Sequence, residues 1–170
     1  MFARPSAVYS QTAYVTNDME QALTLFRDQY DVSSFYVFAN DTPGMLQSDE
    51  AKLKIALAIV GGIEIELIEP QGGTAPLFSA LLPSDGSFAI RFHHVAYRVE
   101  GDLSDFEAHL ASIDPENHPV IWSGGLGDVM RFAYTDERAL LGHYVEHVWM
   151  HADLRAQIAE AIPVYPAVED

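Results

Sequence analysis

The alternation of hydrophobic and polar positions predicts the same order of elements twice along the chain. The first half reads as a strand at 12–16, a helix from 19 to about 30, and strands at 35–38, 52–60 and 63–68. The second half reads as a strand at 92–99, a helix at 102–113, and strands at 120–122, 129–134 and 143–149. Two-residue alternation indicates the strands, and three- to four-residue spacing indicates the helices. The chain is therefore predicted to be an internal repeat of two strand–helix–three-strand modules.

Glycine and proline positions set the expected boundaries of this α+β fold. We predict a first module over residues 8–70, a linker over 71–90 and a second module over 91–150. Residues 151–170 are expected to form a short C-terminal helix and a tail, with the helix stopped by Pro163. Within the first module, Gly61-Gly62 between two strand-like runs predicts a hairpin.

Corresponding strands of the two modules carry polar residues at matching positions. Gln11 opens the first strand of one module, and His94 opens the first strand of the other. Glu66 and Glu146 lie in the two closing strands, at nearly the same separation from these residues. Glu66 shares a strand face with Glu64, opposite a purely apolar face, so both glutamates are expected to point into solvent or a polar cavity.

The chemistry of these residue types favours a divalent metal ion. The sequence has no cysteine, so any metal site must be built from histidine, carboxylate or amide groups. One amide, two carboxylates and one imidazole suit Zn, Ni, Co, Mn or Fe better than Mg or Ca. Taken singly, each residue also has an ordinary structural explanation, and Gln11 is equally typical of a strand-edge amide.

All seven histidines lie at or after position 93, and most have a simple structural interpretation. His93 and His94 are adjacent in a strand and are expected to point to opposite faces. The register with Gln11 assigns His94 to the site and leaves His93 to the core. His109, on the predicted helix, and His118, in a loop, are expected to be exposed, whereas His143 and His147 are expected to pack on the apolar face of the last strand.

Composition excludes several kinds of partner. With 25 acidic against 9 basic residues, the formal net charge of −16 opposes binding to nucleic acid or to an anionic membrane surface. The N-terminus lacks the apolar stretch of a signal peptide, and no apolar run is long enough to cross a bilayer. These features predict a cytoplasmic protein that acts on a small molecule.

Three motifs carry a resemblance to the vicinal oxygen chelate superfamily. They are Ala13-Tyr-Val-x-x-Asp-Met-Glu-x-Ala-Leu23, Ile65-Glu-Leu-Ile-Glu-Pro70 and His93-His-Val-Ala-Tyr97. The superfamily includes glyoxalase I, methylmalonyl-CoA epimerase, extradiol dioxygenases and antibiotic-resistance binding proteins, and the resemblance covers roughly residues 8 to 150. It implies two βαβββ modules that form a curved mixed sheet around a cavity, and a homodimer. It also implies that Gln11, Glu66, His94 and Glu146 are metal ligands, the set of residue types found in the animal type of glyoxalase I.

The resemblance implies an enolisation reaction, as in a metal-dependent isomerase, epimerase or lyase. The substrate would carry two adjacent oxygens and lose a carbon-bound proton to a carboxylate. Glu146 is the candidate base, and Glu66 is the alternative base or the reprotonating partner. Few basic residues are available for coenzyme A phosphates, although Arg91, Arg98 and Arg131 are candidates for a local patch.

Two other functions remain open at this stage. One is a binding protein that sequesters a cationic or aromatic small molecule without chemistry, which the strong acidity favours. The other is an extradiol dioxygenase, but that chemistry uses two histidines and one carboxylate on iron, and Gln11 stands in the place of one histidine.

Overall fold

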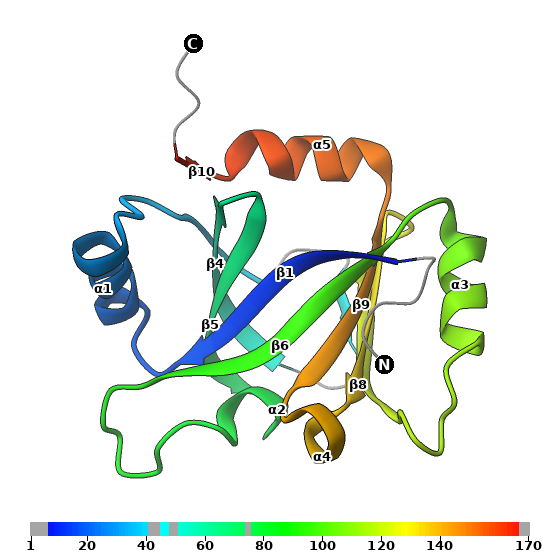
Figure 1. Cartoon of the computed structure of the whole chain (residues 1–170), viewed down its shortest axis with the longest axis horizontal. Helices are drawn as coiled ribbons and strands as arrows, with labels where there is room; N and C mark the ends of the chain where they lie inside the picture. Colours follow the sequence, from blue (N-terminus) through cyan, green and yellow to red (C-terminus); the bar gives the residue numbers. More distant parts are fainter. Residues whose placement is uncertain (1–6, 41–44, 48–50, 74–75, 167–170) are drawn as a thin grey trace.

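The predicted two-module sheet is confirmed by the computed structural model, which describes residues 7–40, 45–47, 51–73 and 76–166. A strongly curved mixed sheet forms the body of the molecule, with helices packed around it (Figure 1). The strands are β1 (Ala7–Thr16), β2 (Tyr36–Ala39), β3 (Met45–Gln47), β4 (Ala51–Val60), β5 (Ile63–Gly73), β6 (Ile90–Val99), β7 (Val120–Leu126), β8 (Met130–Asp136), β9 (Tyr144–Met150) and β10 (Val164–Tyr165). The helices are α1 (Met19–Tyr30), α2 (Pro76–Ser79), α3 (Leu103–Ala111), α4 (Arg138–Leu141) and α5 (Ala152–Ala161).

The two modules have the same strand order and meet at the centre of the sheet. The sheet runs β10-β4-β5-β1-β6-β9-β8-β7-β3, with β2 also paired to β4. In each module the first and last strands are parallel neighbours, β1 with β5 and β6 with β9. The antiparallel pairing of β1 with β6 joins the modules. The opening strands and the closing strands of both copies therefore lie side by side.

Two short strands cross from one module to the edge of the other. β3 lies between β2 and β4 in sequence, yet it pairs with β7 of the second module. β10 follows the second module and pairs with β4 of the first. The sequence pattern predicted neither strand, because each owes its conformation to a partner that is distant in sequence.

One helix of each module covers the outer, convex side of the sheet. In α1, Asp18 caps the N-terminus by accepting a hydrogen bond from the Gln21 N–H, and Met19 and Ala22 pack against Leu67 of β5. In α3, Asp102 and Asp105 form a capping box, and Phe106 packs beneath the helix. The inner, concave side of the sheet is left for the core and the site.

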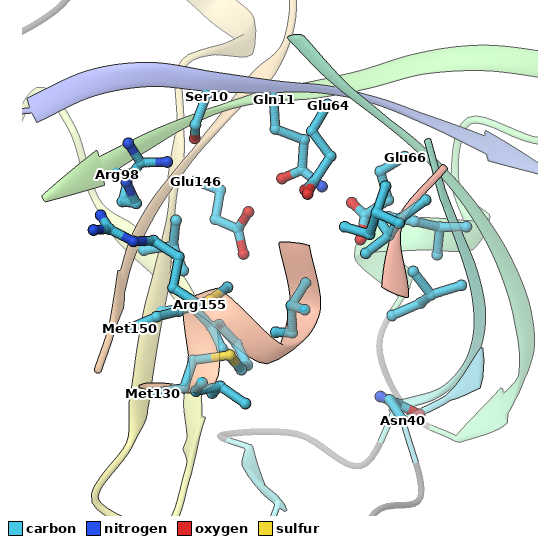
Figure 2. Close-up of a pocket in the computed structure, with 18 of the residues that line it drawn as sticks. Ser10, Gln11, Asn40, Glu64, Glu66, Arg98, Met130, Glu146, Met150 and Arg155 are labelled. Carbon is cyan, nitrogen blue, oxygen red and sulfur yellow. The ribbon is translucent and has the colours of Figure 1, made fainter. Parts of the chain in front are cut away.

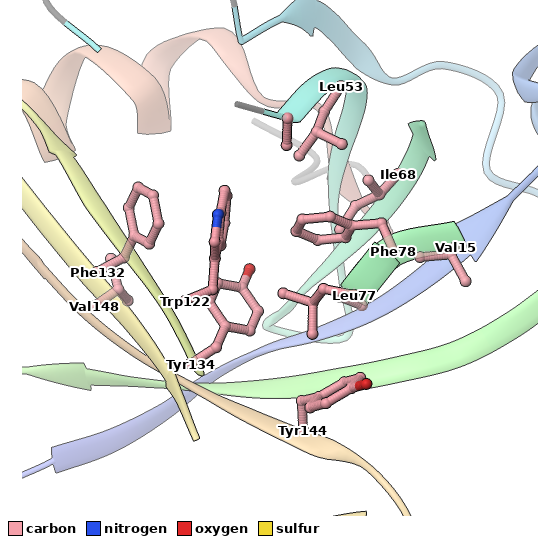
Figure 3. Close-up of a cluster of buried hydrophobic side chains, with 12 residues drawn as sticks. Val15, Leu53, Ile68, Leu77, Phe78, Trp122, Phe132, Tyr134, Tyr144 and Val148 are labelled. Atoms are coloured by element: carbon pink, nitrogen blue, oxygen red, sulfur yellow. The ribbon is translucent and has the colours of Figure 1, made fainter. Parts of the chain in front are cut away.

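A core cluster that draws on both modules fills part of the concave side (Figure 3). Leu53 and Ile68 come from the first module, and Trp122 and Phe132 from the second. Phe78 of α2 is 1% exposed and lies between them, with its ring edge-to-face against Trp122 at 5.1 Å. The predicted linker therefore contains a short helix, α2, whose buried side chains Leu77 and Phe78 pack in the core.

The last helix lies across an open end of the curved sheet. α5 follows β9 directly and leads into β10 on β4, so it spans from the second module to the first (Figure 1). None of the described helices is long and apolar enough to cross a membrane.

Candidate active site

A cavity of about 500 Å³ opens on the concave side of the sheet and lies under α5. Its walls come from both modules and are mostly apolar. Its polar groups include Gln11, Glu64, Glu66 and Glu146 at one end, with Arg98 and Arg155 at the side (Figure 2). A partly enclosed apolar chamber with a few convergent polar groups is typical of a small-molecule site.

The four predicted metal ligands come from four strands that lie side by side, in the order β5, β1, β6 and β9. Ala13 of β1 pairs with Glu66 on one side and with His94 on the other. The His94 Nε2 atom lies 3.5 Å from Glu66 Oε2 and 3.4 Å from Glu146 Oε2. Gln11 lines the same end of the cavity and hydrogen-bonds to the Glu66 carboxyl. The structure thus brings all four residues together.

The expectation that His93 and His94 point to opposite faces is wrong. In the pairing of β1 with β6, Ala13 lies opposite His94 and Tyr14 lies opposite Phe92, so His93 is the extra residue of a β-bulge. A bulge interrupts the alternation of side chains along a strand. Both imidazoles are fully buried, and their Nδ1 atoms are 2.8 Å apart.

The hydrogen bonds of His93 determine which nitrogen of His94 carries its proton. His93 Nε2 lies 3.1 Å from the Leu77 carbonyl, which accepts only, so this nitrogen carries a hydrogen. Burial lowers the pKa of His93 well below its usual value, so the ring is neutral and its Nδ1 is an acceptor. His94 must then donate from Nδ1 to His93. Burial also lowers the pKa of His94 to about 3, which leaves Nε2 with a free lone pair facing the glutamates.

Burial and mutual repulsion favour the protonated form of the cavity carboxyls. Burial raises the pKa of Glu64 to about 7, and repulsion from Glu146 adds to the rise. Burial raises the pKa of Glu66 well above its usual value, with repulsion from Glu146 and Glu64 in the same direction. Burial raises the pKa of Glu146 to about 7, although a hydrogen bond from Tyr134 opposes this rise. At neutral pH these groups are poised to exchange protons.

A divalent ion fits these residues in donor chemistry. Glu66 Oε2 and His94 Nε2 are buried without a hydrogen-bond partner, which is costly for polar atoms. The four side chains together offer amide, carboxylate and imidazole donors, and the His94 lone pair is already oriented toward the carboxylates. Within the described ranges, however, no group of three or more histidine or acidic side chains is arranged so that it could hold a metal ion. The fit therefore rests on the two buried atoms that lack a hydrogen-bond partner, Glu66 Oε2 and His94 Nε2.

The structure adds two residues that sequence reasoning did not assign to the site. Glu64 lines the cavity on the same strand face as Glu66, which agrees with the expected strand alternation, although it was not named as a site residue. Arg155 of α5 also lines it, and no local signal places that helix over the cavity. Of the three arginines considered as a patch, Arg98 lines the cavity, whereas Arg91 and Arg131 are outside its lining.

Two further histidine expectations are revised. His109 was expected to be exposed on its helix but is 4% exposed, and its Nε2 lies 2.9 Å from His147 Nδ1. His118, expected to be exposed in its loop, is partly buried and lies 2.7 Å from Glu137. His147 is outside the cavity lining, and its Nε2 lies 3.3 Å from Thr135 Oγ1.

Comparison with known proteins gives one family and a set of similar structures. The family model described as Glyoxalase/Bleomycin resistance protein/Dioxygenase superfamily matches residues 10–134. No curated protein matches the sequence.

The solved structures resemble this chain in fold at low sequence identity. A methylmalonyl-CoA epimerase from Mycobacterium tuberculosis is 18% identical, with a TM-score of 0.61 and coverage of 92% of this chain and 97% of that chain. A hypothetical protein from Bacillus halodurans C-125 is 17% identical, with a TM-score of 0.57 and coverage of 86% and 96%. A Streptomyces coelicolor methylmalonyl-CoA epimerase in complex with 2-nitronate-propionyl-CoA is 18% identical, with a TM-score of 0.56 and coverage of 85% and 94%. At these identities the likeness is one of fold alone.

Proposed function

Because the chain belongs to the Glyoxalase/Bleomycin resistance protein/Dioxygenase superfamily, we propose that it is a metal-dependent isomerase, epimerase or lyase. Its substrate would be a small molecule with two adjacent oxygens and an acidic carbon–hydrogen bond. The ligands of the divalent ion (Zn, Ni, Co, Mn or Fe) would be Gln11, Glu66, His94 and Glu146. The protein would act in the cytoplasm as a homodimer.

One observation carries this proposal. The Nε2 atom of His94, to which the hydrogen bonds of His93 assign a free lone pair, lies within 3.5 Å of a carboxylate oxygen from each module, and both glutamates line a ligand-sized cavity. Neutral imidazole with a hydrogen-bonded second nitrogen is the usual state of a metal-binding histidine. His93 supplies that second hydrogen bond here. The arrangement explains why two adjacent histidines are buried together.

When bound, the ion would supply positive charge beside the substrate's adjacent oxygens, where negative charge develops as the carbon-bound proton leaves. Glu146 is the proposed base, because its pKa of about 7 suits proton transfer at neutral pH. The Tyr134 hydroxyl, which hydrogen-bonds to it, would hold the carboxylate in place. Glu66 comes from the other module and would return the proton to the substrate carbon. In the reverse reaction, Glu66 would remove the proton instead.

A second candidate function is a binding protein without chemistry. The mostly apolar cavity wall, with aromatic side chains such as Phe38 and Trp122, favours it. Such a protein needs neither a stoichiometric metal ion nor a proton-transfer group. The two candidates therefore differ in a property that is measured directly.

Metal analysis and proton exchange together test the proposal. Protein purified without chelator is expected to carry one divalent ion per chain. Incubated in D₂O with a panel of 2-hydroxy ketones and 2-oxo acids, it should speed the exchange of an α-proton, followed by proton NMR. Glu146→Gln should slow that exchange by about 10²- to 10⁴-fold, the usual contribution of a general base. Glu107→Gln, an exposed change on α3, is the matched control and should leave the rate unchanged.

A protein without stoichiometric metal, whose ligand binding is unaffected by Glu146→Gln, would contradict the enzyme and support the binding protein. Uptake of oxygen with a catechol and Fe(II) would indicate instead the dioxygenase alternative.

A further inference from the structure

The side of the cavity carries two arginines that a shared glutamate holds in place. Arg98 of β6 donates to Glu100 Oε1 through Nε at 2.9 Å and lies within 2.8 Å of the same oxygen through Nη2. Arg155 of α5 donates through Nη1 to Glu100 Oε2 at 3.0 Å. Figure 2 shows both guanidinium groups beside Glu146, on the side opposite Glu66. We call Arg98, Arg155 and Glu100 the basic rim.

The basic rim places two positive charges at the side of a cavity whose other charged lining residues, Glu64, Glu66 and Glu146, are acidic. Two arginines against one glutamate leave a net charge of +1, and both arginines are among the chain's nine basic residues. Each guanidinium has five N–H groups, so the contacts with Glu100 leave donors on both for a further acceptor. Carboxylates and phosphates are the groups that paired arginines bind best.

Between the basic rim and α2 the cavity has an apolar lining. Met130 and Phe132 of β8 and Met150 of β9 line one side, and Leu154 and Ile158 of α5 line another. No residue of α5 is buried, so its apolar residues face the cavity half-exposed. An apolar ligand in this chamber would cover them and gain the free energy of burying that surface.

These features define a class of ligand, and that this ligand is a substrate rests on the proposed function. We propose that the cavity binds a small amphipathic carboxylate, with its anionic group on Arg98 and Arg155 and an aryl or branched alkyl body in the apolar chamber. The adjacent oxygens of such a substrate would lie at the acidic end, between the basic rim and Glu66. Two arginines that already share one glutamate, and that lie beside Glu146, suit a single carboxylate and not a polyanion.

Fluorescence of Trp122 measures this binding directly. The chain has two tryptophans, and Trp149 lies outside the cavity with its indole N–H on the Gly101 carbonyl. In the variant Trp149→Phe, emission therefore reports on the cavity alone. Titration in excess chelator, with 3-phenylpropionate, 3-phenylpropionamide and acetate as probes, separates the contribution of charge from that of the apolar body.

The acid is expected to bind more than about tenfold more tightly than the amide, as a charge-assisted contact is stronger than a neutral one. Acetate should bind at least about tenfold more weakly than 3-phenylpropionate, because it buries little apolar surface. Arg98→Gln and Arg155→Gln should each remove most of the preference for the acid and leave amide binding within about twofold. Arg27→Gln, an exposed arginine on α1, is the matched control.

Glu100→Gln distinguishes recognition from a structural tie between β6 and α5. If the basic rim recognises an anion, removing the glutamate frees both arginines, and affinity for 3-phenylpropionate should rise. If the basic rim only holds α5 in place, Glu100→Gln and the arginine variants should weaken the binding of the acid and of the amide to the same extent. That result would overturn the proposal. Equal binding of acid and amide by the unaltered rim overturns it as well.

Because the titrations are made in excess chelator, they test the ligand class independently of the proposed metal-dependent function. Acid preference without metal-dependent proton exchange supports the ligand class and contradicts the enzyme. Proton exchange without acid preference supports the enzyme and contradicts the ligand class. A preference for the acid that appears only when metal is added would place the carboxylate at the acidic end and overturn the role of the basic rim.

Discussion

The outer layers of the two modules bury different chemistry at equivalent positions. Beneath α1, Leu67 is 0% exposed and packs with Met19 and Ala22. At the corresponding position of β9, His147 is 8% exposed and lies 2.9 Å from His109 of α3. The same strand and helix arrangement therefore tolerates either an apolar contact or a paired polar contact, provided that the polar groups find partners.

The inner faces differ in a complementary way. The first module contributes Gln11, Glu64 and Glu66 to the cavity lining, whereas the second contributes Glu146 and places the buried His94 beside Glu66 and Glu146. The copies have therefore diverged so that neither holds the full set of groups. A site shared across the junction requires both modules to be folded.

The largest effect is expected in the outer layer. Leu67→Ala removes a fully buried side chain and should lower the free energy of unfolding by about 2–5 kcal/mol. His147→Leu leaves His109 without this partner and should cost about 1–3 kcal/mol. The double change His109→Leu and His147→Leu should cost less than His147→Leu alone, because no imidazole remains that has lost the other as a partner. Urea unfolding followed by circular dichroism measures all three, and a double variant weaker than the single one would refute the partnership.

The next largest effect is expected in the pH dependence of the free energy of unfolding, measured in excess chelator. Glu64 has a folded-state pKa of about 7 against an ordinary value of 4.5, so the folded state binds the proton more tightly. Its stabilising contribution is therefore complete below pH 4.5 and is lost as the pH rises toward 7. The stability of Glu64→Gln should differ least from that of the unaltered protein at pH 5 and exceed it at pH 8, by up to about 3 kcal/mol.

Unfolding at pH 5, 6, 7 and 8 tests this, with Tyr144→Phe as the control at the equivalent position of the second module. Parallel pH profiles of Glu64→Gln and the unaltered protein would show that Glu64 keeps its proton equally well when unfolded.

The third prediction exchanges the opening residues of the two modules. His94→Gln removes the imidazole whose lone pair faces both carboxylates, and should weaken Zn²⁺ or Ni²⁺ binding by more than about tenfold. Gln11→His supplies a second imidazole and should preserve or strengthen it. Calorimetric titration measures both affinities. Equal loss in both variants would show that the opening residues act through packing and not through ligation.

The smallest effect concerns the starts of the two outer helices. Asp18 caps α1 through one backbone N–H, whereas Asp102 accepts from Ser104 and Asp105 in a capping box. Each aspartate-to-alanine change should cost about 1 kcal/mol, and the change at Asp102 should cost more because two backbone donors lose their acceptor. Thermal unfolding of both variants ranks them, and the reverse order would show that the box adds nothing.

Local patterns predicted the parts of the fold that depend on neighbouring residues. The hairpin at Gly61-Gly62 forms as expected, and both glycines adopt positive φ, at 60° and 83°. The start of α1 at Met19 and its end at Tyr30 also agree. The repeat itself brought Glu66 and Glu146 to one place, because equivalent strands of two copies meet across the centre of the sheet.

Features that depend on distant partners were not predictable in this way. The bulge at His93 is decided by the pairing of β6 with β1, and strand alternation along β6 does not reveal it. The placement of Arg155 depends on α5 crossing to the first module, which follows from the pairing of β10 with β4. Partners that are distant in sequence, and not propensity, decide these details.

The exchange of β3 and β10 between the two edges also constrains how the protein reaches its native state. β4 gains β10 only when the last part of the chain is available, and β7 gains β3 from a segment made much earlier. During synthesis the Ile59–Val60 end of β4 therefore lacks its strand partner until β10 has emerged, although β2 already pairs with residues 54–57. Such non-local pairings raise the contact order and slow the search for the native topology. The gain is cooperativity, since neither half can complete its sheet or its cavity alone.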